Sequence, residues 1–283
     1  MRTSSPPRLT THSIWATTTS TCPRSFVEAG VAPVLIAGSV RAAWSDASSG
    51  DLRPLQAGMP PGLALEKWAG QATDPGRSPH PIREVHWLDQ VHGATVVVVP
   101  DPDRNRSGTV PGDRSVASAF AGTGDALVSD SRLVSVAVLT ADCASVALGS
   151  AEGVFAAVHA GWKGLLGGVV ERTVEAMRAM GATEVSGALG PCIHAECYEF
   201  SDVDLARVTA VYGEGVGSRT TSGRPALDIP AVVSAALAVA GVSERSGVDR
   251  CTACGGRYFS HRERGERGRQ ALIVWSTASG DPG

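Results

Sequence analysis

The sequence predicts an α+β fold in which mixed β-sheets are flanked by helices. Short apolar runs bounded by Gly, Pro, Asp and Ser recur through most of the chain, whereas helical periodicity is confined to a few segments. The 283 residues are 43% hydrophobic and 19% charged, which is enough for one large core. We therefore treat residues 31–283 as one domain. Residues 1–30 are rich in Thr, Ser and Pro, and we expect a disordered arm there.

The predicted strands follow the apolar runs in chain order. We expect them at residues 34–43, 82–88, 94–99, 125–128, 133–139, 154–158, 185–189 and 271–275. Helical spacing predicts helices at residues 164–180, ended by Gly181, and at 203–211 and 231–239. Residues 45–81 read as loop apart from a short helix at 63–68, and residues 100–124 read as an exposed loop.

Charge and hydropathy exclude several classes of function. The net charge is −3 without a long block of like charge, so we expect no nucleic-acid partner. No run of about 18 apolar residues and no signal-peptide pattern occurs, so we expect no membrane partner. Six scattered cysteines differ from a dense disulfide framework and favour a reducing cytoplasm. Oligomeric state is not predictable.

Three residues at the ends of predicted strands form a candidate metal site. His92, Cys143 and His159 are the ligand types that zinc prefers, and three protein ligands with a vacant fourth position are typical of a catalytic site. Their spacings, 143 − 92 = 51 and 159 − 143 = 16, are too wide for a zinc finger, so the fold would have to assemble the site. Spacing alone favours a simpler interpretation, a buried thiol and hydrogen-bonded histidines.

Several sequence words make the metal interpretation more specific. In order they are Asp-Gln-Val-His-Gly at 89–93, Asp-Ala-Leu-Val at 125–128, Thr-Ala-Asp-Cys at 140–143, His-Ala-Gly-Trp-Lys-Gly at 159–164, Gly-Pro-Cys-Ile at 190–193 with Cys-Tyr-Glu at 197–199, and Phe-Ser-His-Arg at 259–262 with Gly-Arg at 268–269. In this order they resemble the YfiH family, also called the laccase-domain or polyphenol oxidase family. The resemblance extends over residues 82–275.

This resemblance implies a fold, a metal and an activity. It implies a YfiH-like fold, grouped with cytotoxic necrotizing factor, in which His92, Cys143 and His159 hold one zinc ion. It further implies phosphorolysis of purine nucleosides (adenosine, inosine, guanosine and methylthioadenosine) to base and ribose 1-phosphate, with deamination of adenosine. Zinc would acidify a water for deamination. One departure concerns residues 41–50, which lack the double glycine and Asn-Leu word typical of the family, and this leaves the choice of substrate open.

Phosphorolysis requires cationic groups near the sugar. The candidates are Arg41, Lys163, Arg262 and Arg269. Lys163 starts a predicted helix, where backbone N–H groups also favour an anion. Three of them have a simpler interpretation: Lys163 as a solvated cation, and Arg262 and Arg269 as partners of Glu263 and Glu266.

Other polar residues near these words have open roles. Asp142 is a candidate catalytic residue that either orients a ligand imidazole or acts as an acid or base, and it is equally compatible with a turn. Gln90 is a candidate base contact, although such amides often satisfy backbone groups. Cys251 and Cys254 form a single CxxC, which is weak evidence for a redox motif or for a four-thiolate site completed by Cys192 and Cys197.

Competing functions remain open. Cys143 as nucleophile with His159 as base would suit a Cys-His hydrolase acting on a cell-wall precursor, as some relatives are described. A copper-dependent polyphenol oxidase is disfavoured, because the 7 histidines are too few for a multicopper site and only two of them, His92 and His159, are candidate ligands. A non-enzymatic binding protein that retains a vestigial metal site is the third alternative.

Overall fold

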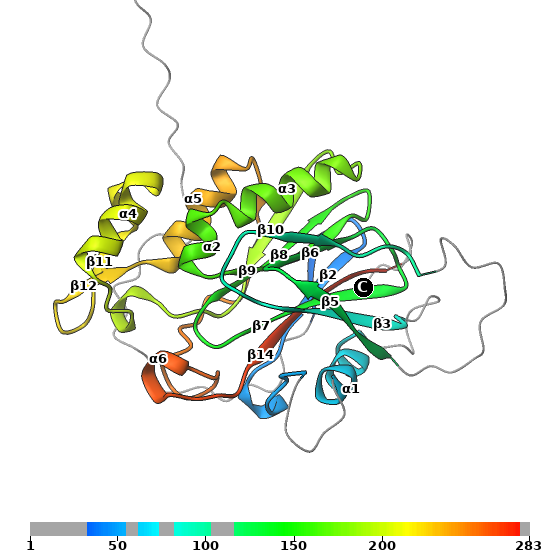
Figure 1. The fold of residues 1–283 in the computed structure, drawn as a ribbon, viewed down its shortest axis with the longest axis horizontal. Coiled ribbons are helices and arrows are strands. Elements are labelled where there is room, and N and C mark those ends of the chain that lie inside the picture. Colours follow the sequence, from blue (N-terminus) through cyan, green and yellow to red (C-terminus); the bar gives the residue numbers. More distant parts are fainter. Residues whose placement is uncertain (1–32, 55–61, 74–81, 103–115, 278–283) are drawn as a thin grey trace, which may run out of the picture.

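The computed structural model describes residues 33–54, 62–73, 82–102 and 116–277. Two six-stranded sheets are stacked with helices on their outer sides (Figure 1). The first sheet has the order β1 (Val34–Ala37), β2 (Val40–Trp44), β14 (Gln270–Ser276), β7 (Val134–Thr140), β3 (Glu84–Asp89) and β5 (Ala117–Thr123). The second has the order β13 (Ser243–Glu244), β10 (Val185–Leu189), β8 (Ala144–Ser150), β9 (Phe155–Ala160), β6 (Ala126–Ser129) and β4 (Val96–Val98).

Both sheets are mixed, which confirms the predicted α+β class. Strand β3 runs parallel to β5 and β7, whereas β14 is antiparallel to β2 and β7. A separate hairpin is formed by β11 (Gly217–Arg219) and β12 (Pro225–Leu227). The helices are α1 (Leu63–Ala72), α2 (Trp162–Leu166), α3 (Val169–Ala179), α4 (Asp202–Tyr212), α5 (Ile229–Val239) and α6 (His261–Arg264). No helix in the described ranges is long and apolar enough to cross a membrane.

Apolar side chains fill the space between the sheets and beneath the helices. Val136, Leu127 and Phe155 lie in the central layer and are fully buried. Helices α3 and α5 cover the second sheet, and α1 covers the first. Complete burial of one such side chain contributes about 1.5–3 kcal/mol. The strands β7, β8 and β9 are buried along their whole length, so their positions are strongly constrained.

The chain crosses from the first sheet to the second at three places that concern function. His92 lies between β3 and β4, Asp125 between β5 and β6, and Cys143 between β7 and β8. His159 lies on β9 and pairs with Ser145 of β8, two residues after Cys143. The three crossings therefore meet at one edge of the stacked sheets, beside the end of β9.

The predicted strand at residues 34–43 is in fact a hairpin. β1 and β2 are antiparallel and are joined at Gly38 and Ser39. Gly38 has a φ of 51°, and a Cβ there would lie 2.9 Å from Cα of Ala151. The turn needs glycine for both reasons. Apolar residues on both sides of the turn gave no sign of it in the sequence.

The predicted helix at residues 164–180 is two helices. α2 ends before Gly167, and α3 begins after Gly168, whose φ is 75°. Two adjacent glycines interrupt the helical hydrogen bonding, although the apolar spacing continues across them. Gly181, with a φ of 100°, follows the end of α3 and donates to the carbonyl of Arg178, as expected of a C-terminal glycine.

Five strands were not expected, among them the short strands β11, β12 and β13. β5 lies within residues 100–124, which were predicted to be a loop, and β8 had no prediction at all. β5 is an edge strand whose partly exposed residues lack a clear apolar alternation. The predicted strands at 82–88, 94–99, 125–128, 133–139, 154–158, 185–189 and 271–275 and the helices at 63–68, 203–211 and 231–239 correspond to β3, β4, β6, β7, β9, β10, β14, α1, α4 and α5. The arm predicted at residues 1–30 lies outside the described residues.

Candidate metal centre

The structure brings together the three residues that the sequence singled out as metal ligands. One donor atom from each of His92, Cys143 and His159 lies within 4.8 Å of the others. Sγ of Cys143 is 3.7 Å from Nε2 of His92, close to the separation of about 3.6 Å expected for two ligands of a tetrahedral zinc. The imidazole rings of His92 and His159 meet edge to face, with centroids 4.8 Å apart. His159 is buried and His92 is exposed, so the group opens toward solvent on one side.

Asp125 fixes the orientation of two of the three residues. Its carboxylate is fully buried and accepts a hydrogen bond of 2.8 Å from Nδ1 of His159. It also accepts from the backbone N–H groups of His92 (2.8 Å) and Gly93 (2.7 Å). Because Nδ1 of His159 is a donor here, Nε2 is the ring nitrogen that can bind a metal, once its own proton has been displaced. The carboxylate therefore positions a ligand side chain and the turn that carries the second histidine.

The same contacts set the charges at the site. Burial acts to raise the pKa of Asp125, but the hydrogen bonds from His159, Gly93 and His92 outweigh it and lower the pKa. Burial likewise opposes ionisation of Cys143, yet hydrogen bonds with His159 and His92 lower its pKa to about 6. Burial acts to lower the pKa of His159, whereas Asp125 and Cys143 raise it to about 9. The metal-free group is thus a thiolate beside an imidazolium at neutral pH.

The backbone around the centre adopts left-handed conformations. His92 (φ 59°) and Asp142 (φ 95°) are the two non-glycine residues of the described chain with positive φ. Each such residue costs on the order of 1–3 kcal/mol, which is typical of functional sites. Gly161 has an ordinary φ, but a Cβ there would lie 2.9 Å from Cδ2 of His92 and 3.4 Å from Sγ of Cys143. Gly161, two residues after His159, therefore provides space for the other two candidate ligands.

Asp142 has other partners than a ligand imidazole. Its carboxylate accepts from the hydroxyl of Thr252 (2.7 Å) and from the backbone N–H of Arg262 (2.6 Å). Asp125, not Asp142, holds the imidazole, which corrects that part of the sequence-based expectation. The guanidinium of Arg262 lies 4.8 Å from the ring of Tyr198 and donates to the carbonyl of Glu199. Asp142 thus connects the Cys143 turn to the segment that carries Arg262.

Gln90 follows the end of β3, and Arg41 lies on β2. The side-chain amide of Gln90 donates to the carbonyl of Leu139 and accepts from its N–H, both at 2.8 Å. The amide therefore satisfies backbone groups and is not presented to a ligand. Arg41 pairs with Trp275, which pairs with Ser135 near the start of β7. Cys143 follows the opposite end of β7, roughly 17 Å further along at 3.3 Å per residue. Arg41 therefore lies away from the centre, contrary to expectation.

The remaining cationic candidates lie in different settings. Lys163 is exposed on α2, with Nζ 5.6 Å from the ring centroid of Trp162. Helix α2 has only five residues, so the expected help from a helix dipole is small. Arg269 donates through its side chain to nearby carbonyls and through its backbone to Asp51. Burial lowers the pKa of Arg269, and the charges of Cys143 and Asp142 act in the opposite direction.

The sequence did not identify the role of Asp125. This residue opens one of the words quoted above, and the signal that could have found it was a carboxylate directly before a buried strand. A buried carboxylate requires partners, and a metal-binding histidine is a common one. Thr252 and Gly161 were also missed, because their contacts are with segments far away in the sequence.

Fold and site together define a protein with stacked mixed sheets and a carboxylate-supported His-Cys-His centre at their edge. The profile of the family described as multi-copper polyphenol oxidoreductase laccase matches residues 77–277. The chain belongs to this family, which includes the YfiH and DUF152 proteins.

Curated relatives in this family have enzyme names. A Streptomyces griseus protein named purine nucleoside phosphorylase ORF3 is 39% identical over 194 residues, covering 68% of this chain and 74% of the relative. A Streptomyces coelicolor purine nucleoside phosphorylase is 40% identical over 194 residues, with the same coverage. A Mycobacterium tuberculosis purine nucleoside phosphorylase is 37% identical over 200 residues, covering 69% and 73%. Relatives at this level support an enzyme of the nucleoside phosphorylase type.

Solved structures show the same fold. A Neisseria meningitidis DUF152 protein has a TM-score of 0.66 at 24% identity and covers 89% of this chain and 100% of its own. Bacillus licheniformis YfiH has a TM-score of 0.66 at 21% identity and covers 84% and 93%. The fold expected from the family resemblance is thereby confirmed.

Proposed function

We propose that this protein is a zinc-dependent purine nucleoside phosphorylase that also deaminates adenosine. The observation that carries the proposal is the convergence of His92, Cys143 and His159 within 4.8 Å, open to solvent at His92. Two imidazole nitrogens and one thiolate suit zinc, and an open fourth position suits catalysis. The names of the relatives supply the substrate class, purine nucleoside and phosphate.

Each residue has a defined task in this proposal. Zinc supplies Lewis acidity and an acidified water when it is bound. Asp125 holds His159 with Nε2 toward the centre, and Asp142 holds the Arg262 segment beside Cys143. In phosphorolysis a phosphate oxygen bonds to the ribose carbon as the bond to the purine breaks, and Lys163, Arg262 and Arg269 are the proposed phosphate contacts.

The experiment combines metal content with product analysis. Protein purified without reductant and its Cys143→Ala variant are assayed for zinc by mass spectrometry and incubated with adenosine and phosphate. We expect about one zinc per chain, lost in the variant, with adenine and ribose 1-phosphate formed by the parent alone. Cys192→Ala is the control, since Cys192 is a buried cysteine outside the centre. Copper in place of zinc, with oxidation of phenols, would support the polyphenol oxidase alternative instead.

A Cys-His hydrolase is the second candidate, because Cys143, His159 and Asp125 form a continuous chain of contacts like that of a thiol nucleophile, its base and an orienting carboxylate. Its substrate would be a cell-wall precursor. A hydrolase of this kind keeps its activity after chelation and loses it on alkylation of Cys143. A zinc enzyme loses activity on chelation and recovers it when zinc is returned.

A further inference from the structure

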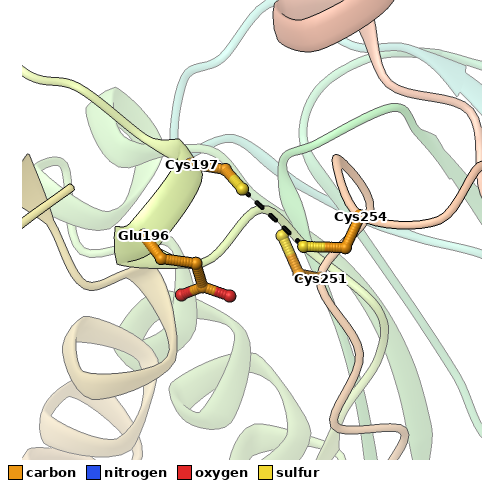
Figure 2. Close-up of side chains that lie close together, drawn as sticks. All are labelled: Glu196, Cys197, Cys251 and Cys254. Carbon is orange, nitrogen blue, oxygen red and sulfur yellow. Dashed lines mark hydrogen bonds between the residues drawn. The ribbon is translucent and has the colours of Figure 1, made fainter. Parts of the chain in front are cut away.

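A second group of metal-ligand side chains lies outside the centre described above. Donor atoms of Glu196, Cys197, Cys251 and Cys254 all lie within 4.8 Å of one another (Figure 2). Glu196 and Cys197 come from the short 3-10 turn Ala195–Cys197, and the other two from a segment more than fifty residues later. Among the described residues, this group and the His-Cys-His centre are the two that have such spacing.

The distances fit a tetrahedral cation. Sγ of Cys197 is 3.7 Å from Sγ of Cys254, and two sulfurs bound to one zinc at 2.3 Å lie about 3.8 Å apart. This distance is far too long for a disulfide between them. The backbone N–H of His194 donates to Sγ of Cys251 at 3.4 Å, which stabilises a negative sulfur. Three thiolates and one carboxylate complete four-coordination without an open position, as in a structural site.

The group can be reached from one side. Cys197 lines an open groove with three acidic residues, Glu199, Asp202 and Glu263, and with two arginines, Arg224 and Arg262. Arg224 is paired with Glu199. His194 lies 3.8 Å from Glu196 and 3.5 Å from Asp249, so the one histidine beside the group faces acidic partners.

Cys254 determines when the site can form. In this structure Cys254 is disulfide-bonded, whereas Cys197 and Cys251 are thiols. We propose that Glu196, Cys197, Cys251 and Cys254 form a second, structural zinc site that is occupied once the disulfide of Cys254 is reduced. A phosphine reductant and water convert the disulfide to two thiols and a phosphine oxide. Zinc then displaces the protons of the three cysteines.

The proposed site is connected to the first centre through one residue. Thr252 lies between Cys251 and Cys254, and its hydroxyl donates to Asp142, the neighbour of Cys143. A cation that fixes the segment 251–254 therefore also fixes the donor to Asp142. The proposal does not depend on the phosphorylase reaction, because it concerns a site with no open position for substrate.

The test uses the full chain carrying Cys143→Ala, which removes a ligand of the first centre. After treatment with the phosphine and dialysis against zinc, we expect about one zinc per chain by mass spectrometry, and less than about a tenth of that without reduction. Cobalt in place of zinc should give sulfur-to-metal charge-transfer absorption, which reports on thiolate ligation independently of activity.

Two variants in the same background locate the ion. Cys197→Ser should abolish the reduction-dependent zinc, and Cys192→Ala, a matched buried cysteine outside the group, should retain it. The proposal is overturned if the reduced Cys143→Ala protein binds no zinc or cobalt. This outcome needs no change to the proposed ligands, so it does not depend on how the variants fold. Zinc retained in Cys197→Ser would also overturn it.

Discussion

The two metal-ligand groups differ in what holds their side chains in place. Cys143 and His159 lie next to or within strands that are buried along their length, and a buried carboxylate orients His159. Cys197 lies in a three-residue 3-10 turn. Cys254 is disulfide-bonded, so its sulfur can act as a thiolate ligand only after reduction. Strands and hydrogen-bonded partners therefore hold the first group in place, whereas the second group lies in a short turn and a segment without helix or strand.

The largest expected difference is in thiol reactivity. Hydrogen bonds from His159 and His92 outweigh burial and lower the pKa of Cys143 to about 6, whereas burial raises the pKa of Cys197 to about 12. Since the thiolate is the reactive form, metal-free protein at pH 7 should be alkylated at Cys143 more than about a hundredfold faster. Peptide mapping by mass spectrometry after iodoacetamide treatment measures both rates.

The alkylation rates of Cys143 and Cys197 should also differ in their dependence on pH. A lowered pKa means that the Cys143 thiolate persists from high pH down to about 6, so its alkylation should slow only below that pH. Cys197 should react slowly throughout the neutral range. Equal rates for the two thiols would contradict the thiolate-imidazolium assignment.

Removal of the supporting carboxylate should weaken the first group alone. Asp125→Asn keeps the shape of the side chain but removes the charge that orients His159, and loss of such a partner costs about 10–100-fold in metal affinity. Competition with a zinc-binding dye measures the affinity. Asp202→Asn, the same change at an exposed position of α4, should leave it unaltered. An unchanged affinity in Asp125→Asn would mean that the backbone positions His159 by itself.

A methyl group beside the ligands should have a smaller effect. In Gly161→Ala the new Cβ would lie 2.9 Å from His92, and such overpacking costs about 1–3 kcal/mol. We expect lower thermal stability and weaker zinc binding in calorimetry. Gly215→Ala is the matched control, because its Cβ meets nothing within 4 Å and its φ is ordinary. Equal stability of the two variants would show that His92 moves aside freely.

The smallest effect is expected at the exposed cation. Lys163→Ala should raise the KM for phosphate about two- to fivefold without loss of zinc, because an exposed charge interacts weakly with an anion in water. Steady-state kinetics at varied phosphate concentration measures the change. Lys67→Ala, an exposed lysine on α1 beyond the first sheet, is the control. A fall in kcat with KM unchanged would assign Lys163 a role other than holding phosphate.

The sequence predicted most of the strands with long apolar runs, although it missed β8, which is buried along its whole length. β7, β9 and β14 were recognisable because most of their residues are apolar. β5 was not, because an exposed edge strand needs no apolar alternation. The split between α2 and α3 depends on Gly168, and helical spacing continues through it.

The candidate ligands were predicted because their residue types suit zinc and, above all, because the words around them resemble those of a known family. Their supporting contacts were not, since Asp125 meets His159, and Thr252 meets Asp142, across long stretches of chain. Arg41 illustrates the same limit in reverse. Its position after the first predicted strand suggested a substrate contact. The strand register instead places Arg41 toward the end of the sheet opposite the metal centre.

The three crossings between the sheets have a mechanical consequence. His92 follows a strand of the first sheet, as does Cys143, while His159 belongs to the second sheet. An ion bound to all three joins the two sheets at one edge and opposes their sliding or separation. Heating should then release the ion and part the sheets in a single event, so that loss of metal reports on the mechanical integrity of the sandwich as well as on its chemistry.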